Sequence, residues 1–194
     1  MTDYQPLTRT DLLSLEAYAE QRAAFRSRAI AHKRQRSVAL GEHMTLMFED
    51  RLTVQYQIQE MLRIERIFEP DAIQEELDTY NPLISDRTSL KATLLIEFAD
   101  PAVRALRLAE WRGIEDRLYF QVGTGARHYA IADADMDRSN ETKTSAVHFL
   151  DFAVNEDLLG ALRAGDPVQL GVDDARYPRQ VTLTAEQCRQ LAAA

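Results

Sequence analysis

The chain has 194 residues, of which 45% are hydrophobic, and this is enough to bury the core of one domain. The formal net charge of −8 argues against a general nucleic-acid binder and against adhesion to anionic lipid, since both need a basic surface. The single cysteine, Cys188, excludes an internal disulfide and a Cys-based zinc site, and we interpret it as an inert helical thiol. With no apolar run of about 18 residues and no signal-peptide pattern, the sequence predicts one cytoplasmic domain over residues 1–194.

The first predicted helix covers residues 11–34, with Thr8 or Thr10 as its cap. Three cations, Arg22, Arg26 and Lys33, fall within its apolar arc, and His32 lies at the edge of that arc. The apolar positions are Leu12, Leu15, Tyr18, Ala19, Phe25, Ala29 and Ile30. Cations on a core-facing stripe need partners or must extend from its edge.

A short hairpin is expected next, because apolar residues alternate over residues 38–48 around Gly41–Glu42. His43 beside this turn is expected to be exposed. The central helix then covers residues 48–68, which contain no Gly or Pro.

Polar residues interrupt the apolar arc of this central helix. Glu49, Thr53, Gln57 and Glu60 follow at helical spacing, and Glu65 projects between apolar positions. A set of glutamines and an arginine marks the wet side: Gln55, Gln59 and Arg66. Carboxylates on a buried stripe must be paired or must change their pKa.

We therefore predict a polar centre between the two helices, where misplaced cations meet misplaced carboxylates. Its candidate residues are Glu49, Gln57, Glu60, Glu65, Arg22, Arg26 and His32. Glu60 is expected to be buried and paired with Arg22 or Arg26, with Gln57 completing its hydrogen bonds. Such a centre is either a structural ion-pair network or a site that holds an anion or a metal.

The two helices themselves are expected to pack through Tyr18, Phe25, Ile64 and Ile67.

The rest of the chain predicts one more long helix and then a β-rich half. The third helix covers residues 71–80, with Pro70 in its first turn, and Asn81–Pro82 ends it. Strands are expected at residues 90–98, 116–123, 128–135, 145–154, 167–174 and 179–185, and short helices at 100–111, 155–165 and 185–194. The fold class is α+β: a helical N-terminal half, about 8–85, packed on a mostly antiparallel C-terminal sheet, about 88–194, with short interposed helices.

Common catalytic and metal motifs do not support a specific activity. The sequence contains no GxGxxG, P-loop, HExxH or GxSxG pattern. Asp133, Asp135 and Asp137 alternate as in a calcium loop, but Arg138 replaces the required glycine, which favours an exposed acidic loop. His148 lies in an apolar strand and is interpreted as packed and hydrogen-bonded.

Several blocks of the sequence resemble an uncharacterised bacterial domain-of-unknown-function family. The blocks are YQIQEM at 56–61, YNPL at 80–83 and SAVHFL at 145–150. This family is often encoded beside rubrerythrin and an iron–sulfur oxidoreductase, so the resemblance implies an auxiliary role in redox or peroxide-stress metabolism. It supplies no catalytic residue. The chain departs from the family pattern at Ser85, where a proline is expected, and at residues 173–175, where an Asp-His-Pro-like turn is expected. If that histidine is a ligand elsewhere in the family, this chain lacks it.

The sequence thus favours an accessory redox protein that binds a partner protein or a small anionic ligand at the polar centre. The alternative is an enzyme that uses Glu49, Glu60 or Glu65 as acid and base or as metal ligands. No cofactor and no nucleic-acid or membrane partner is predicted, and we expect a homodimer.

Overall fold

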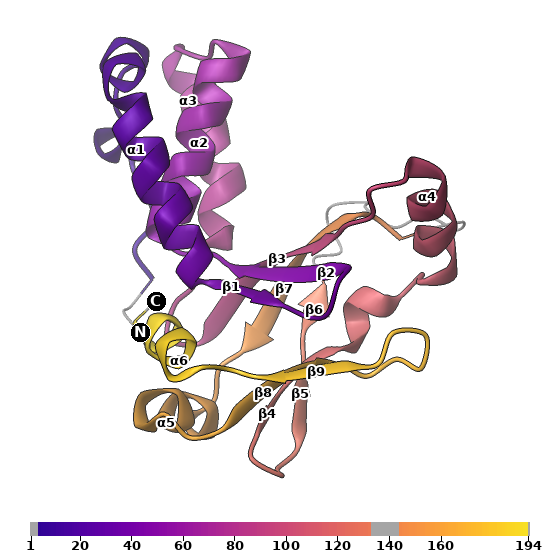
Figure 1. Cartoon of the computed structure of the whole chain (residues 1–194). Coiled ribbons are helices and arrows are strands. Elements are labelled where there is room, and N and C mark those ends of the chain that lie inside the picture. Colours follow the sequence, from indigo (N-terminus) through magenta and orange to yellow (C-terminus); the bar gives the residue numbers. More distant parts are fainter. Residues whose placement is uncertain (1–3, 133–143, 194) are drawn as a thin grey trace.

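The computed structural model describes residues 4–132 and 144–193, and the fold is α+β, as predicted. A group of three helices stands at one end of two packed antiparallel sheets, and α4 (Pro101–Glu110) projects at the other end (Figure 1). The predicted acidic calcium-like motif lies outside the described residues. Within residues 4–132 and 144–193, no helix combines the length and the apolar character that crossing a bilayer requires.

The first sheet joins strands from both halves of the chain. The predicted hairpin is formed by β1 (Ser37–Ala39) and β2 (Met44–Phe48), and it pairs with β3 (Ser89–Ile96). The strand order is completed by β7 (Val147–Ala153) and β6 (Ile131–Ala132). The sheet is therefore not built from the second half alone.

The second sheet has the order β5-β4-β8-β9. Its strands are Arg127–Tyr129 (β5), Leu118–Val122 (β4), Val168–Val172 (β8) and Arg179–Thr182 (β9). The predicted strand over residues 128–135 is wrong as a single element, because β5 pairs with β4 while β6 pairs with β7 of the other sheet. The chain passes from the second sheet to the first at Ala130, whose amide donates to the Leu118 carbonyl. The predicted strand is therefore divided between the two sheets.

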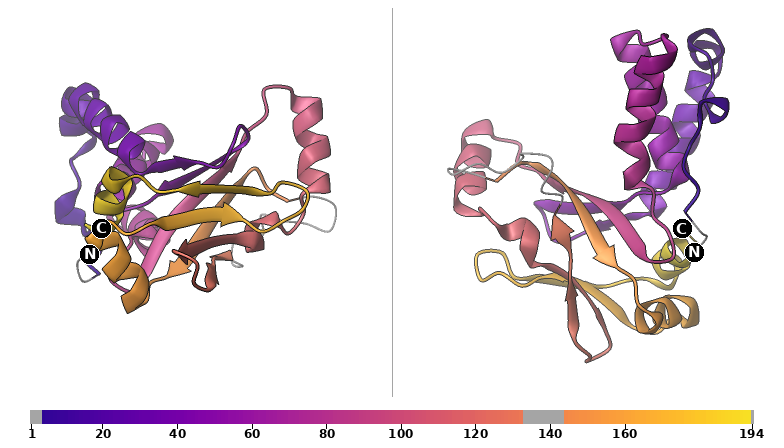
Figure 2. Two further views of the ribbon diagram at one scale, coloured as in Figure 1. Left: turned by 60° about the horizontal axis from the view of Figure 1, so that its bottom comes forward. Right: turned by 180° about the vertical axis from the view of Figure 1, so that it is seen from behind.

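The two sheets enclose the main core. Phe120 of β4 contacts Phe48 of β2 and Phe152 of β7, with ring centroids 5.7 and 4.8 Å apart. α5 (Glu156–Ala164) and α6 (Ala185–Ala192) lie at the same end of the sheets as the three helices, on the other side of the first sheet (Figure 2). Strand alternation leaves the opposite surface of the first sheet half-exposed next to the three-helix group.

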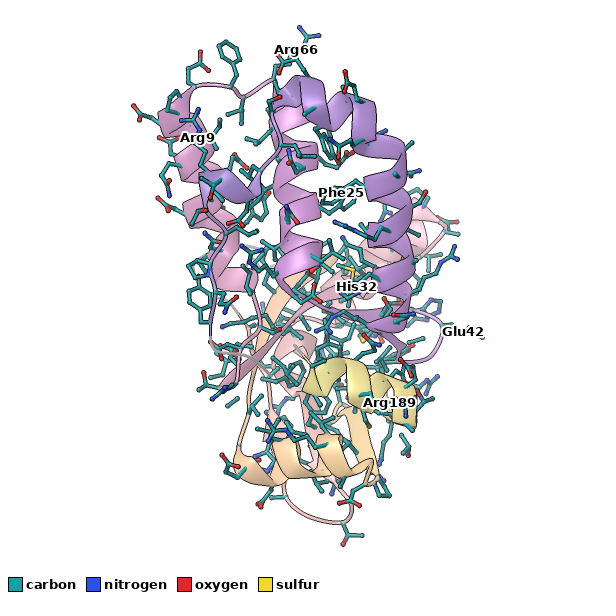
Figure 3. The ribbon with its side chains drawn as sticks, turned by 90° about the vertical axis from the view of Figure 1, so that its left-hand side faces the viewer. Arg9, Phe25, His32, Glu42, Arg66 and Arg189 are labelled. Carbon is teal, nitrogen blue, oxygen red and sulfur yellow. The ribbon has the colours of Figure 1, made fainter. Side chains whose placement is uncertain are left out.

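The three-helix group, called the helical arm here, has its own smaller core. It consists of α1 (Leu15–Gln35), α2 (Arg51–Glu65) and α3 (Pro70–Tyr80), with a short 3-10 helix η2 (Asn81–Leu83) below α3. Its buried apolar residues are Leu7, Val54, Ile58, Leu62, Leu77 and Ile84. α1 and α2 pack through Tyr18, Phe25 and Tyr56, and Figure 3 shows Phe25 between the two helices.

That contact confirms the predicted helix pair but not all of its residues. Ile64 is 59% exposed, so its assignment to the interface is wrong, and Ile67 lies beyond the end of α2. The helix ends earlier than predicted because Arg66 adopts a left-handed conformation with φ 57°.

The first helix begins four residues later than expected, because residues 11–13 are held in another way. The Gln59 side chain accepts from the Leu13 amide at 2.6 Å and donates to the Leu13 carbonyl, while Gln55 donates to the Asp11 carbonyl. A glutamine amide thus replaces the helical partners of this backbone. Gln59 is fully buried, so its assignment to the wet side of the central helix is wrong.

Candidate functional site

A cavity of about 330 Å³ lies between the helical arm and the first sheet. Figure 1 shows how the arm rises from this sheet. Three neighbouring strands form its floor, because Met47, Thr93 and Phe149 are cross-strand partners in one row. The helical arm contributes the wall. The complete lining is Met47, Glu49, Val54, Gln57, Tyr80, Leu83, Thr93, Leu95, Val147 and Phe149.

Glu49 is the charged group of this cavity, and hydroxyl groups hold its carboxylate on both sides. Thr53 donates to Oε2 at 2.5 Å and Thr93 donates to Oε1 at 2.6 Å. The side chain is only 7% exposed, and Thr53 and Thr93 are also buried. These bonds fix the carboxylate orientation, because each oxygen has a separate donor.

The backbone of Glu49 is equally fixed, since it joins the end of β2 to the start of α2. Its amide donates to the Lys91 carbonyl at 2.8 Å, and its carbonyl accepts from the Ser85 hydroxyl at 2.6 Å. Asp50 then caps α2 through the amides of Leu52 and Thr53. The sequence predicts Glu49 inside the central helix, and this is wrong: the helix begins at Arg51, so Glu49 lies just before it.

No cation forms an ion pair with Glu49 in the part of the chain that the structure describes. Lys91 lies on the same sheet surface, but its ammonium pairs with Asp151. Arg36 interacts electrostatically with Glu49, but its guanidinium donates hydrogen bonds to the carbonyls of Phe48 and Gln190. Burial lowers the pKa of Arg36, while Asp50 and Glu49 oppose this effect.

Two more polar groups line the cavity. The Gln57 amide and the Tyr80 hydroxyl form no hydrogen bond with any residue of 4–132 or 144–193. The rings of Tyr80 and Phe149 give the cavity two aromatic walls. A second cavity of about 350 Å³ adjoins it, with Leu83 and Phe149 in both linings.

The predicted pairing of Glu60 with Arg22 is present, but it is separate from the cavity. The Arg22 guanidinium contacts both carboxylate oxygens, at 2.8 Å from Nε and 2.7 Å from Nη2, and Tyr18 donates to Oε1 at 2.6 Å. The bonds from Arg22 hold the pKa of Glu60 below its ordinary value, and burial and this carboxylate raise the pKa of Tyr18. Tyr18 thus takes the place expected for Gln57, and Glu60 is only half-buried.

The other predicted site residues do not join these groups. His32 Nε2 lies 2.5 Å from Asp50 Oδ2 at the base of the arm, where Figure 3 shows the ring near the sheet. Arg26 and Glu65 are exposed. The prediction of a single polar centre is therefore wrong. The candidate residues lie in three separate places: the cavity with Glu49 and Gln57, the Arg22–Glu60 pair, and the His32–Asp50 pair.

Residues of the second half complete the cavity, and only a weak pattern in the sequence indicates them. Thr93 is a polar position in the apolar run LKATLLIEF, two residues after Lys91 on the same strand face. Periodicity assigns both to one surface but cannot place that surface beside Glu49, because the contact spans 44 residues of chain.

His148 is packed and hydrogen-bonded, as predicted, within a second buried polar group. Thr144 lies 2.8 Å from both Glu115 Oε2 and His148 Nε2. Burial first, and then the charge of Glu115, raises the pKa of Asp116 beside them. Cys188 is buried, and burial raises the pKa of its thiol. In residues 4–132 and 144–193 no cluster of three His, Cys, Asp or Glu side chains has the arrangement to hold a metal ion.

The fold and the cavity define an α+β protein with one buried carboxylate at the junction of a helical arm and a sheet. The chain belongs to the family described as protein of unknown function (DUF3501), whose model matches residues 6–194. It is similar to a crystal structure of a novel protein of unknown function from Burkholderia pseudomallei K96243. The two are 46% identical over 97% of this chain and 98% of that chain, with a TM-score of 0.91. The comparison with curated proteins found no match.

Proposed function

We propose that this protein binds a small organic ligand in the cavity between α2, η2 and the first sheet. The observation that carries the proposal is the carboxylate of Glu49, which lines this cavity at 7% exposure without an ion-pair partner in the described residues. A buried charge without a partner is costly, and binding sites are where proteins keep such groups. The volume of about 330 Å³ falls in the range of small-molecule pockets, which have mostly apolar walls and a few placed polar groups.

The geometry favours a binding role over the alternative of an acid–base enzyme. Glu60 is already bound by Arg22 and Tyr18, and Glu65 is exposed, so of the three proposed catalytic carboxylates only Glu49 lines the cavity. Both oxygens of Glu49 accept hydrogen bonds from fixed hydroxyls, which suits an electrostatic partner for a ligand. An anionic ligand has less support, because Arg22 is engaged by Glu60 and the charged group of the cavity is itself negative.

The setting of this binding role is proposed from the family resemblance. The resemblance implies an accessory protein of a redox or peroxide-stress system that works beside a partner protein. Elemental analysis of untagged protein separates this proposal from the metalloenzyme alternative. Stoichiometric iron, manganese or zinc would support the enzyme.

Filling the cavity tests the proposal directly. Val147→Trp places a large ring in the cavity, while Ala153→Trp adds the same ring to an exposed position on the same face of β7. Benzyl alcohol and benzylammonium, followed by amide NMR shifts, serve as probes. We expect shifts at Thr93 and Phe149 in the wild type and in Ala153→Trp, and their loss in Val147→Trp. Equal binding by both variants, or no shift in the wild type with either probe, contradicts the proposal.

A further inference from the structure

We infer that the ligand of this cavity is an organic monocation, an amine or amidinium on a compact aromatic or aliphatic body, whose charge lies against Glu49. The inference rests on the proposed function and adds the chemical class of the ligand. Its basis is the juxtaposition of the Glu49 carboxylate with two aromatic side chains in one largely apolar cavity.

The carboxylate has acceptor capacity left for such a ligand. Its two oxygens offer about four lone-pair sites, and the hydroxyls of Thr53 and Thr93 occupy one site on each oxygen. A cation that donates to Glu49 therefore forms charge-assisted hydrogen bonds without displacing either threonine. The threonines hold the carboxylate in place before the ligand arrives.

The surrounding charges leave this role open. Lys91, the lysine on the same face of β3, is paired with Asp151. Arg36 is bound to two backbone carbonyls and lies 3.4 Å from Asp50, which it shares with His32. Neither cation donates to the Glu49 carboxylate, so a cationic ligand provides the direct partner that no residue of 4–132 or 144–193 provides.

The remaining lining favours an organic cation over a metal ion. Calcium and magnesium take six or more oxygen ligands, whereas the walls around Glu49 are largely apolar: Met47, Val54, Leu83, Leu95 and Val147. The ring of Tyr80 attracts a positive charge through its face. The Gln57 carbonyl and the Tyr80 hydroxyl offer further acceptors for an N–H donor.

Three probes of equal size and different charge test the inference: benzylammonium, benzyl alcohol and benzoate. We expect benzylammonium to bind the wild-type protein at least about tenfold more tightly than benzyl alcohol, with benzoate weakest. Glu49→Gln keeps the shape of the side chain and removes the charge, so the preference for benzylammonium should disappear. Asp151→Asn, which neutralises a carboxylate paired with Lys91 on the same sheet, should keep it.

The outcomes distinguish a failure of the cation inference from a failure of the proposed function. If benzyl alcohol or benzoate binds in the cavity as tightly as benzylammonium, the cation inference is overturned while cavity binding stands. Loss of the preference in Asp151→Asn but not in Glu49→Gln also overturns it, because the charge would then act at the neighbouring cavity. If none of the probes perturbs the cavity, the proposed function fails. Thr93→Ser, which retains the hydroxyl donor, gives a second test if Glu49→Gln does not fold: the preference should persist, and its loss contradicts the inference.

Discussion

The hydroxyl of Thr93 donates to the carboxylate of Glu49 across 2.6 Å, and this bond joins the base of the helical arm to the centre of the first sheet. Glu49 follows β2, and Thr93 lies in β3, which pairs with β2. The same bond therefore orients the carboxylate of the cavity and links the two structural parts that enclose it.

Removing this donor should destabilise the protein. Thr93→Val keeps the shape but leaves one oxygen of a buried carboxylate without its partner, which costs on the order of 1–3 kcal/mol. Urea unfolding followed by circular dichroism measures the change. Thr93→Ser, which retains the hydroxyl, is the control and should lose much less. Equal stability of the valine variant and the wild type would show that the bond contributes nothing.

Tyr18 should contribute through its hydroxyl as well as through its ring. The side chain is fully buried and donates to Glu60 at 2.6 Å, so Tyr18→Phe is expected to cost about 1 kcal/mol. Tyr56→Phe is the matched control, because Tyr56 stacks on Phe25 and its hydroxyl has no bond among the described residues. A control that loses as much as Tyr18→Phe would contradict this account of the arm.

The stability of the arm should fall on acidification. Hydrogen bonds from Arg22 lower the pKa of Glu60 from its ordinary 4.5, so the folded state holds this carboxylate ionised where the unfolded state begins to bind a proton. The stabilisation is present above the ordinary value and is lost as the pH falls through the folded pKa. The free energy of unfolding should decrease between about pH 5 and pH 3, and less steeply in Glu60→Gln.

Asp11 contributes in the same direction, because the hydrogen bond from Arg51 lowers its pKa from 3.8 to about 2. Its contribution should persist to lower pH than that of an ordinary aspartate. An Asp11→Asn variant with the same pH slope as the wild type below about pH 4 would argue against this pair.

The turn between β1 and β2 should require glycine at position 41. Gly41 has φ +77°, and a Cβ there would lie 2.6 Å from the Tyr177 hydroxyl. That hydroxyl donates to the Leu40 carbonyl and accepts from the His43 amide. Gly41→Ala is therefore expected to cost more than about 1 kcal/mol.

Gly123→Ala, in the turn between β4 and β5, separates the cost of backbone strain from the cost of the steric contact expected at Gly41. Gly123 also has a positive φ, of 52°, but a Cβ there would meet no atom within 4 Å. Its loss of thermal stability should be smaller than that of Gly41→Ala. Equal losses would show that the contact with Tyr177 has no effect.

Local sequence patterns predict most of the helices and strands but not the tertiary contacts between them. The caps at Asp100 and Asn155 and the alternation in β2 and β7 are visible in the sequence, because they depend on neighbours along the chain. The pairing of Arg22 with Glu60 also followed from two helix faces. These features can be predicted from the periodicity of apolar residues and from the free-energy cost of burying a charge without a partner.

The cavity could not be predicted, because it depends on which strand lies beside which. Glu49 was recognised as an unusual carboxylate, but its partner Thr93 became a neighbour only when β2 paired with β3. Gln59 shows the same limit. Periodicity places it on the solvent-exposed side of the helix, whereas its side chain is buried and forms hydrogen bonds with the amide and the carbonyl of Leu13. Long-range pairing decides both cases.

A crystal structure of the protein grown with benzylammonium would show whether Glu49 binds a cation in the cavity. We expect density in the cavity, with the ammonium nitrogen about 3 Å from a carboxylate oxygen of Glu49 and the ring between Tyr80 and Phe149. Density for the probe only at other positions, or an ammonium group directed away from Glu49, would contradict it.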